Sequence, residues 1–229
     1  MNQWGLTATE VALVLYIGFS TIGLVFVPLI AQATGDSTAT LTAWGVAVQS
    51  PPSTAAQFVM DGVTSSSLAY HSRTGSIERL GHGVYRLANF PSSPREPLIA
   101  AAAALGKDAI VSHESALQLY GVSDVAPSRL HFTVPRARRY VTAPADNVEV
   151  HTTTRPFAPG DVVQHEGFRA TSLTRSIVDA ARTYTGSEQI VMAVREGLRR
   201  GLLAPHQLER AMQNVPKRVR DLIEEGQST

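Results

Sequence analysis

The chain of 229 residues contains no cysteine. This absence excludes disulfide bonds, thiolate nucleophiles and zinc sites built from cysteine, and it is compatible with a reducing compartment. Lysine is scarce as well, since Lys107 and Lys217 are the only lysines among the 20 basic residues. Because 44% of the residues are hydrophobic, the chain has enough apolar material to bury a core, which excludes a disordered chain.

Basic residues are missing from the first third of the chain. No lysine or arginine precedes Arg73, whereas three of the 19 acidic residues do. Residues 73–229 therefore hold all 20 basic residues against 16 acidic ones, a balance of +4, although the whole chain carries a formal charge of only +1. This balance fits an anionic partner. The preference for arginine suits bidentate contacts to phosphate or guanine, but codon bias in a GC-rich genome explains most of it.

One long hydrophobic run, Val11–Ile30, carries no charge over 20 residues. Its length and polarity meet the criterion for a transmembrane helix. It lacks the pattern of a signal peptide, because the residues before it contain no basic residue and include Glu10. Three interpretations stay open: a membrane anchor, a buried or interfacial helix, or a start codon assigned upstream of the true one. We therefore treat residues 1–36 as a separate hydrophobic segment.

Residues 38–90 have the pattern of a winged helix-turn-helix. Leu41–Gln49 places Leu41, Trp44 and Val48 on one helical face and predicts a first helix. Ser53 and Thr54 are typical cap residues ahead of a second short helix, 55–60, which an Asp-Gly pair ends.

A third helix and a hairpin follow. Thr64 or Ser65 can cap a helix that continues to about Arg73, and Gly75 stands where a left-handed C-terminal residue is expected. The strand-like runs 76–80 and 84–87 are joined by Gly-His-Gly, which supplies the positive φ angles of a tight hairpin. The pattern predicts a recognition helix and a wing.

Small hydroxyl residues open this helix, and they allow close approach to DNA and hydrogen bonds to phosphates or base edges. Basic and aromatic residues follow on the helix and on the wing. The predicted DNA-contacting residues are Thr64, Ser65, Ser66, Ser67, Tyr70, His71, Arg73, Arg79, His82 and Arg86. A solvated helix with an ordinary strand pair is the alternative interpretation.

Residues 94–229 predict a second domain, mixed α/β, with a small sheet and several helices. The expected strands are 129–134, 148–152 and a pair within 162–170 that turns at Gly167. The expected helices are 94–105, 112–120 with Ser112 as cap and Gly121 as stop, 172–184, 187–200, 204–213 and 216–225. The charge-alternating tail, 217–229, is expected to be a solvated, fraying helix end. The whole chain is thus α+β.

No catalytic constellation is visible. The seven histidines are scattered, and His113-Glu114 lacks the second histidine of a helical zinc motif. His131 and His151 lie on different predicted strands and can meet across a sheet, but their alternation phase opposes the apolar set. We therefore expect solvated surface histidines, and no catalytic residue, metal or cofactor.

Arg195, Arg199 and Arg200 form a second basic cluster on the predicted helix 187–200. Arg195 and Arg199 share a face at i, i+4 spacing. Because Glu188 and Glu196 lie on the same helix, a solvated, salt-paired face is favoured over a DNA-backbone or partner patch.

Four segments, in this order, resemble the abortive-infection AbiEi-type antitoxins of type IV toxin–antitoxin systems, especially actinobacterial ones. They are GHGVYRLANFPSSPREPL, AIVSHESALQLYGVSD, RLHFTVPRARR and ATSLTRSIVDAAR. The likeness covers about Thr40 to Arg210. Its most specific pieces are G-x-Y-R-L at 83–87, S-H-E-S-A-L at 112–117 and T-S-x-x-R-S-I-V-D at 171–179.

The resemblance implies a winged helix-turn-helix followed by an α/β antitoxin domain. It implies binding to inverted repeats in the chain's own promoter, cooperative autorepression with self-association on DNA, and neutralisation of a nucleotidyltransferase-like toxin without a required stable complex. The recognition helix (64–73) and the wing residues Arg79, His82 and Arg86 carry over by motif. No catalytic residue carries over.

The sequence therefore predicts a cytoplasmic, DNA-binding transcriptional repressor that is not an enzyme. Two alternatives stay open. One is a membrane-tethered winged-helix interaction protein, held as a single-pass protein by residues 11–30. The other is a nuclease-like enzyme that uses the second domain.

Overall fold

A computed structural model describes residues 53–54, 65–81, 83–88, 93–154, 156–165, 167–183, 185–213 and 215–228. The hydrophobic segment 1–36 and the predicted helices 41–49 and 55–60 lie outside these residues. Among the helices that are described, none combines the length and apolarity needed to cross a membrane. The chain divides into two compact units, Met1–Glu96 and Pro97–Thr229, and each is described by itself.

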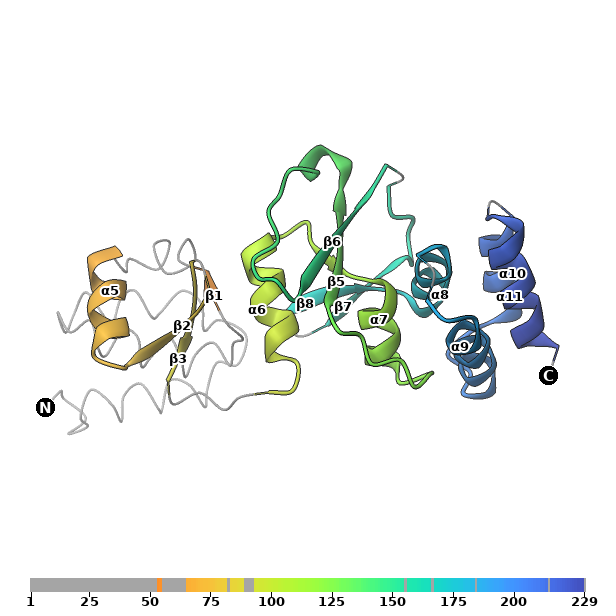
Figure 1. Cartoon of the computed structure of the whole chain (residues 1–229), viewed down its shortest axis with the longest axis horizontal. Coiled ribbons are helices and arrows are strands. Elements are labelled where there is room, and N and C mark those ends of the chain that lie inside the picture. Colours follow the sequence, from red (N-terminus) through yellow and green to blue (C-terminus); the bar gives the residue numbers. More distant parts are fainter. Residues whose placement is uncertain are drawn as a thin grey trace, which may run out of the picture. The chain divides into compact units, whose positions relative to one another are not determined.

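The first unit contains one described helix and a three-stranded sheet (Figure 1). The helix is α5 (Ser65–Arg73), and the strands are β1 (Ser53–Thr54), β2 (Ile77–Gly81) and β3 (Val84–Leu87). The strand order is β1-β3-β2, and both pairings are antiparallel. Leu68, Ile77 and Val84 are buried, so the helix and the hairpin share a small apolar core.

The ends of α5 and of the hairpin follow their local signals. Gly75 has φ +78°. The Ser76 N–H donates to the carbonyl of His71, five residues earlier, over 3.0 Å, and this is the 6→1 hydrogen bond of a Schellman motif. Gly83 has φ +70° at the hairpin turn. The helix ending at Arg73 and the strand pair after it are confirmed.

Ser53 and Thr54 lie in a strand, and the helix 55–60 that they were predicted to cap lies outside the described residues. Both residues form strand β1, where Ser53 is paired with Tyr85 and Thr54 with Val84. The physical reason is the pairing partner, because the outer edge of β3 lies some 30 residues further along the chain and satisfies the backbone of β1. A local cap pattern contains no information about such a distant partner.

The second unit is built on a five-stranded mixed sheet with the order β6-β5-β4-β8-β7. Its strands are β4 (Ile110–Val111), β5 (Leu130–Pro135), β6 (Val148–Thr153), β7 (Val162–His165) and β8 (Phe168–Thr171). The pairs β5–β6 and β4–β8 are parallel, and the other two are antiparallel. Four of these strands were predicted, whereas the two-residue strand β4 was not. The mixed α+β class is confirmed.

Helices surround this sheet and extend beyond it. They are α6 (Glu96–Leu105), α7 (His113–Tyr120), α8 (Leu173–Arg182), α9 (Ser187–Arg199), α10 (Pro205–Met212) and α11 (Lys217–Gln227), with a 3₁₀ turn, η1 (Arg136–Arg138). The sequence predicted all six helices to within about two residues. Ser112 and the left-handed Gly121, φ +59°, bound α7 as expected.

Two apolar clusters hold the second unit together. One joins α6 to the face of the sheet that carries Phe132, Val134, Phe168 and Ala170. The other joins α7 to α8–α11 through residues such as Ile177. In Figure 1, α6 lies on one side of β5 and β6, and α7 and α8 lie on the other.

The charged tail is packed rather than solvated, so the expectation of a fraying end is wrong. Val219, Leu222 and Ile223 of α11 are buried in the helical cluster. Gly226 lies so close to α9 that a Cβ there would be 2.6 Å from Val194 Cβ. The apolar residues of α11 share one helical face, and this face outweighs the alternating charges on the other side.

Candidate functional site

The exposed face of α5 is the candidate nucleic-acid surface. Ser66, Ala69, Tyr70 and Arg73 are exposed, and their spacing places them in one stripe along the helix. Tyr70 is 54% exposed, and the Arg73 guanidinium lies 6.0 Å from the centre of its ring. The stripe thus combines a hydroxyl, a phenol and a cation, all of which can donate hydrogen bonds.

The opposite face of α5 is buried, and one of the predicted DNA-contacting residues, His71, lies on it. His71 is 1% exposed and lies on the same face as Leu68, which is 2% exposed. The prediction that His71 contacts DNA is therefore wrong for this fold, because its i, i+3 spacing from Leu68 turns its ring into the core.

The hairpin presents one exposed arginine next to its turn. Arg79 on β2 is exposed, and its Nε–H donates to the Gly81 carbonyl over 3.1 Å. This bond fixes the stem of the side chain and leaves the terminal amino groups of the guanidinium for an anionic partner. Neither Arg73 nor Arg79 forms an ion pair with any residue that the structure describes.

Arg86 behaves differently from Arg79. Its side chain is 15% exposed, and its guanidinium forms ion pairs with Glu78 and, at 2.7 Å, with Glu96. The hydrogen bond from Arg86 to the Glu78 carboxylate, followed by the charges of both glutamates, holds the pKa of Arg86 above its ordinary value. Two carboxylates already satisfy this cation, so the predicted role of Arg86 as a DNA contact does not fit the structure.

The side chains of four further predicted residues are not among the described parts of the structure. Thr64 and His82 lie outside the described residues. Ser65 and Ser67 are placed on the backbone of α5, at its first and third positions. The candidate surface therefore rests on Ser66, Tyr70, Arg73 and Arg79.

The second basic cluster, on α9, is an ion-paired surface. Arg199 is 71% exposed and forms a 2.6 Å ion pair with Glu196, and Arg200 lies 3.9 Å from the same carboxylate. The hydrogen bond from Arg199 holds the pKa of Glu196 below its ordinary value. Arg200 also donates to the carbonyls of Tyr120 and Gly121, at 3.1 and 2.9 Å. The salt-paired interpretation of this helix is confirmed for Arg199 and Arg200.

The expectation for His131 and His151 is half right. Their phase in the sheet is as predicted, opposite the apolar Phe132 and Val134. They are not solvated, since their side chains are only 14% and 17% exposed and their rings are hydrogen-bonded to each other. The alternation along the strands carries no signal of this burial, because the residues that cover the two histidines belong to α7.

The described elements define a mixed α+β chain with a helix–hairpin unit and a larger sheet-and-helix unit. Neither a search with protein-family models nor one among curated proteins finds a match. Among solved structures, the chain is similar to the RV2827C protein from Mycobacterium tuberculosis, with a TM-score of 0.58 and 17% sequence identity. The similarity covers 83% of this chain and 78% of that protein, and at this identity it concerns the fold alone.

Proposed function

We propose that the chain is a DNA-binding antitoxin that represses its own operon and counteracts a nucleotidyltransferase-like toxin. The observation that carries DNA binding is the exposed stripe Ser66, Tyr70 and Arg73 on α5, followed at once by a hairpin that presents Arg79. A short helix fits the major groove of B-DNA, which is about 12 Å wide. The hairpin then lies beside the phosphate backbone as a wing.

The sheet of the first unit supports the winged form of this module. Strand β1 precedes α5 in the chain but pairs with β3, the second strand of the hairpin. In a winged helix, a short strand ahead of the recognition helix joins the wing in this order. Strand β1 pairs with Val84 and Tyr85 at the turn end of the hairpin, and Tyr85 is also the partner of Arg79 on β2, so the sheet fixes the backbone that carries Arg79.

The chemistry of the exposed residues assigns them different roles on DNA. Arg73 at the end of the stripe and Arg79 on the wing neutralise phosphates, which gives affinity that falls with salt concentration. Ser66 and Tyr70 donate to phosphate oxygens or base edges and contribute orientation and sequence preference.

The antitoxin part of the proposal comes from the family resemblance. Its two motif segments in the second unit begin α7 and α8, which share one apolar cluster through Leu117 and Ile177. We expect this unit to carry the activity against the toxin. As a regulator of its own operon, the protein acts in the cytoplasm.

Binding to the DNA upstream of the chain's own gene tests the repressor. The full chain is titrated against a fluorescent duplex of that region and against a scrambled duplex of equal composition, at several salt concentrations. We expect tighter binding to the native duplex by about a thousandfold or more, the lower end for specific DNA binders. Equal affinity for both duplexes at every salt concentration would remove the repressor proposal.

Single substitutions test the assigned surface. Arg73→Ala and Arg79→Ala should each weaken binding and reduce the slope of log affinity against log salt by about 1. Arg139→Ala is a matched control, because Arg139 is also exposed and its guanidinium lies 4.3 Å from the ring centre of an exposed tyrosine, Tyr140. Unchanged binding in both Arg73→Ala and Arg79→Ala would place the DNA surface elsewhere.

Co-expression tests the antitoxin role. A nucleotidyltransferase-like gene next to this one is induced in cells with or without the chain, and growth is measured. We expect the chain to restore growth. We also expect Arg73→Ala to restore growth while it fails to repress a promoter reporter, since the two activities belong to different units. Growth arrest in the presence of the folded wild-type chain contradicts the antitoxin assignment.

A further inference from the structure

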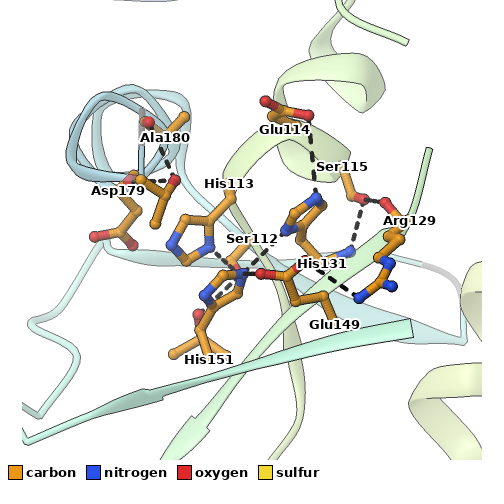
Figure 2. Close-up of polar contacts among 12 residues, drawn as sticks. Ser112, His113, Glu114, Ser115, Arg129, His131, Glu149, His151, Asp179 and Ala180 are labelled. Carbon is orange, nitrogen blue, oxygen red and sulfur yellow. Dashed lines mark hydrogen bonds and ion pairs between the residues drawn. The ribbon is translucent and has the colours of Figure 1, made fainter. Parts of the chain in front are cut away.

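Three histidines from separate elements meet on the polar face of the five-stranded sheet. His113 is the first residue of α7, His131 lies on β5 and His151 on β6 (Figure 2). The ring centres of His113 and His151 are 3.8 Å apart, and those of His131 and His151 are 5.2 Å apart. We call these three residues the histidine cluster.

The strand register brings a carboxylate to the same place. In the parallel pair β5–β6, His131 is paired with Glu149 and Thr133 with His151, so all four side chains lie on one face. His131 Nδ1 is 2.9 Å from His151 Nε2, and His151 Nε2 is 3.8 Å from Glu149 Oε1. One potential ligand atom from each of His131, Glu149 and His151 lies within 4.8 Å of the others.

These distances are close to those of a metal site. Two nitrogens on a tetrahedral zinc lie roughly 3.3–3.4 Å apart, because each Zn–N bond is about 2.0–2.1 Å. His131 and His151 therefore need only to open by a few tenths of an ångström to admit an ion. Coordination through Nδ1 leaves the His131 proton on Nε2, which lies 4.0 Å from Glu114 Oε2, the position of an outer carboxylate partner.

The cluster is held in place by buried hydrogen bonds. Ser112 Oγ lies 2.8 Å from both His113 Nδ1 and Thr133 Oγ1, and all three residues are buried. The His131 N–H donates to Ser115 Oγ over 2.9 Å. Ser112 directly precedes α7 and Ser115 lies on it, so the start of this helix holds both the His113 ring and the backbone of β5 at His131.

Backbone strain marks the same place. Of the described residues other than glycine, only His113 has a positive φ, +52°. A residue with a β-carbon is strained in this left-handed backbone conformation. It keeps the conformation only where the surrounding structure holds it in place. The strained backbone sets the imidazole of His113 flat against that of His151.

We propose that His131, His151 and Glu149 form a binding site for one divalent transition-metal ion, with Zn²⁺ as the best match. Two imidazoles and one carboxylate are a zinc ligand set that leaves a fourth position for water. Glu149 is 42% exposed beside the exposed Arg129, so the ion enters from the edge strand β6. The bound ion ties β6, the edge of the sheet, to β5.

Zinc titration of the full, untagged chain tests this site. The protein is treated with a chelator, dialysed and titrated with ZnCl₂ by calorimetry, and binding of Co²⁺ is followed by its visible absorption. We expect one ion per chain and a rise in the melting temperature with zinc concentration, since the ion binds only the folded state.

Variants make the assignment specific. His131→Ala and His151→Ala should lower zinc affinity by more than about a hundredfold, beyond the loss from an outer partner. His206→Ala, which removes an exposed histidine on α10, should bind like the wild type. Glu149→Gln keeps the size of a partly exposed side chain and removes its charge, so it tests the site if a histidine variant fails to fold. No zinc binding by the wild type, or wild-type affinity in both His151→Ala and Glu149→Gln, overturns the proposal and leaves a hydrogen-bonded histidine pair.

Discussion

Two groups of arginines in this chain look alike in the sequence and differ in the structure. Arg73 and Arg79 lie on α5 and the hairpin of the first unit, where the described residues offer them no ion pair. On α9 of the second unit, Arg199 and Arg200 share the carboxylate of Glu196. Within this described part of the chain, the charges of Arg73 and Arg79 are free of competing carboxylates and would attract a phosphate fully. A phosphate near Arg199 and Arg200 would have to compete with the carboxylate of Glu196. We therefore expect local pairing, rather than the number of arginines, to decide which surface attracts DNA.

The same contrast separates the tasks of the two units. The first unit presents the exposed stripe on α5 above a small core of Leu68, Ile77 and Val84. The second unit buries two larger apolar clusters and keeps its polar groups in a fixed network. We infer that binding and stability are carried by different parts of the chain, and four substitutions test this division.

The largest effect is expected from Phe132→Ala. Phe132 is fully buried in the apolar cluster between α6 and the sheet. Its truncation leaves a cavity and should lower the free energy of unfolding by about 3–5 kcal/mol, measured by urea denaturation. The fraction that stays folded should bind DNA with wild-type affinity. A loss of affinity larger than the loss of folded protein would show that the two units do not divide these tasks.

A smaller loss is expected from Gly226→Ala, which tests the packing of α11 on α9. The new Cβ would lie 2.6 Å from Val194 Cβ and 3.0 Å from the Val191 carbonyl oxygen. Neither atom is the end of a flexible side chain, so the helices must separate at a cost of about 1–3 kcal/mol. The measurement is the urea midpoint at constant m-value. Gly186→Ala is the control, because the nearest atom to its Cβ would be Gln189 Cγ at 3.8 Å, an ordinary van der Waals distance.

Arg86→Ala separates an internal ion pair from a DNA contact. Because Arg86 pairs with Glu78 and Glu96, its removal leaves two carboxylates close together on the first unit. We expect a loss of about 1 kcal/mol or less in unfolding free energy, the range for partly exposed pairs, and an unchanged salt slope for DNA binding. A slope reduced by about 1, as expected for Arg73→Ala, would return Arg86 to the DNA surface.

Local signals in the sequence predict most of the second unit. Ser112 and Gly121 mark the two ends of α7, and Gly167, φ +81°, marks the turn between β7 and β8. Each of these signals acts within a few residues, so it can be recognised without knowledge of the fold. They also place α5 and the hairpin strands correctly.

The errors all involve partners that are distant in the chain. Ser53 and Thr54 have the composition of a cap, but β3 makes them a strand. The alternation of β5 and β6 gives the correct phase of His131 and His151, but only the packing of α7 on the sheet reveals that they are covered. Likewise the burial of His71 and the pairing of Arg86 depend on which face of an element meets a neighbour. The sequence therefore predicts which region carries the candidate site, but the structure is needed to tell which residues of that region are exposed.

The smallest effect is expected from Arg199→Ala. Arg199 is highly exposed, and its guanidinium pairs with Glu196 on the same helix. Solvent screens this pair, so the urea midpoint should not change measurably. DNA affinity and its salt slope should also stay at the wild-type values, because we assign phosphate binding to Arg73 and Arg79 of the first unit. If Arg199→Ala weakened DNA binding as much as Arg79→Ala, pairing with a carboxylate would not protect a surface from phosphate, and α9 would have to be counted as part of the DNA-binding surface.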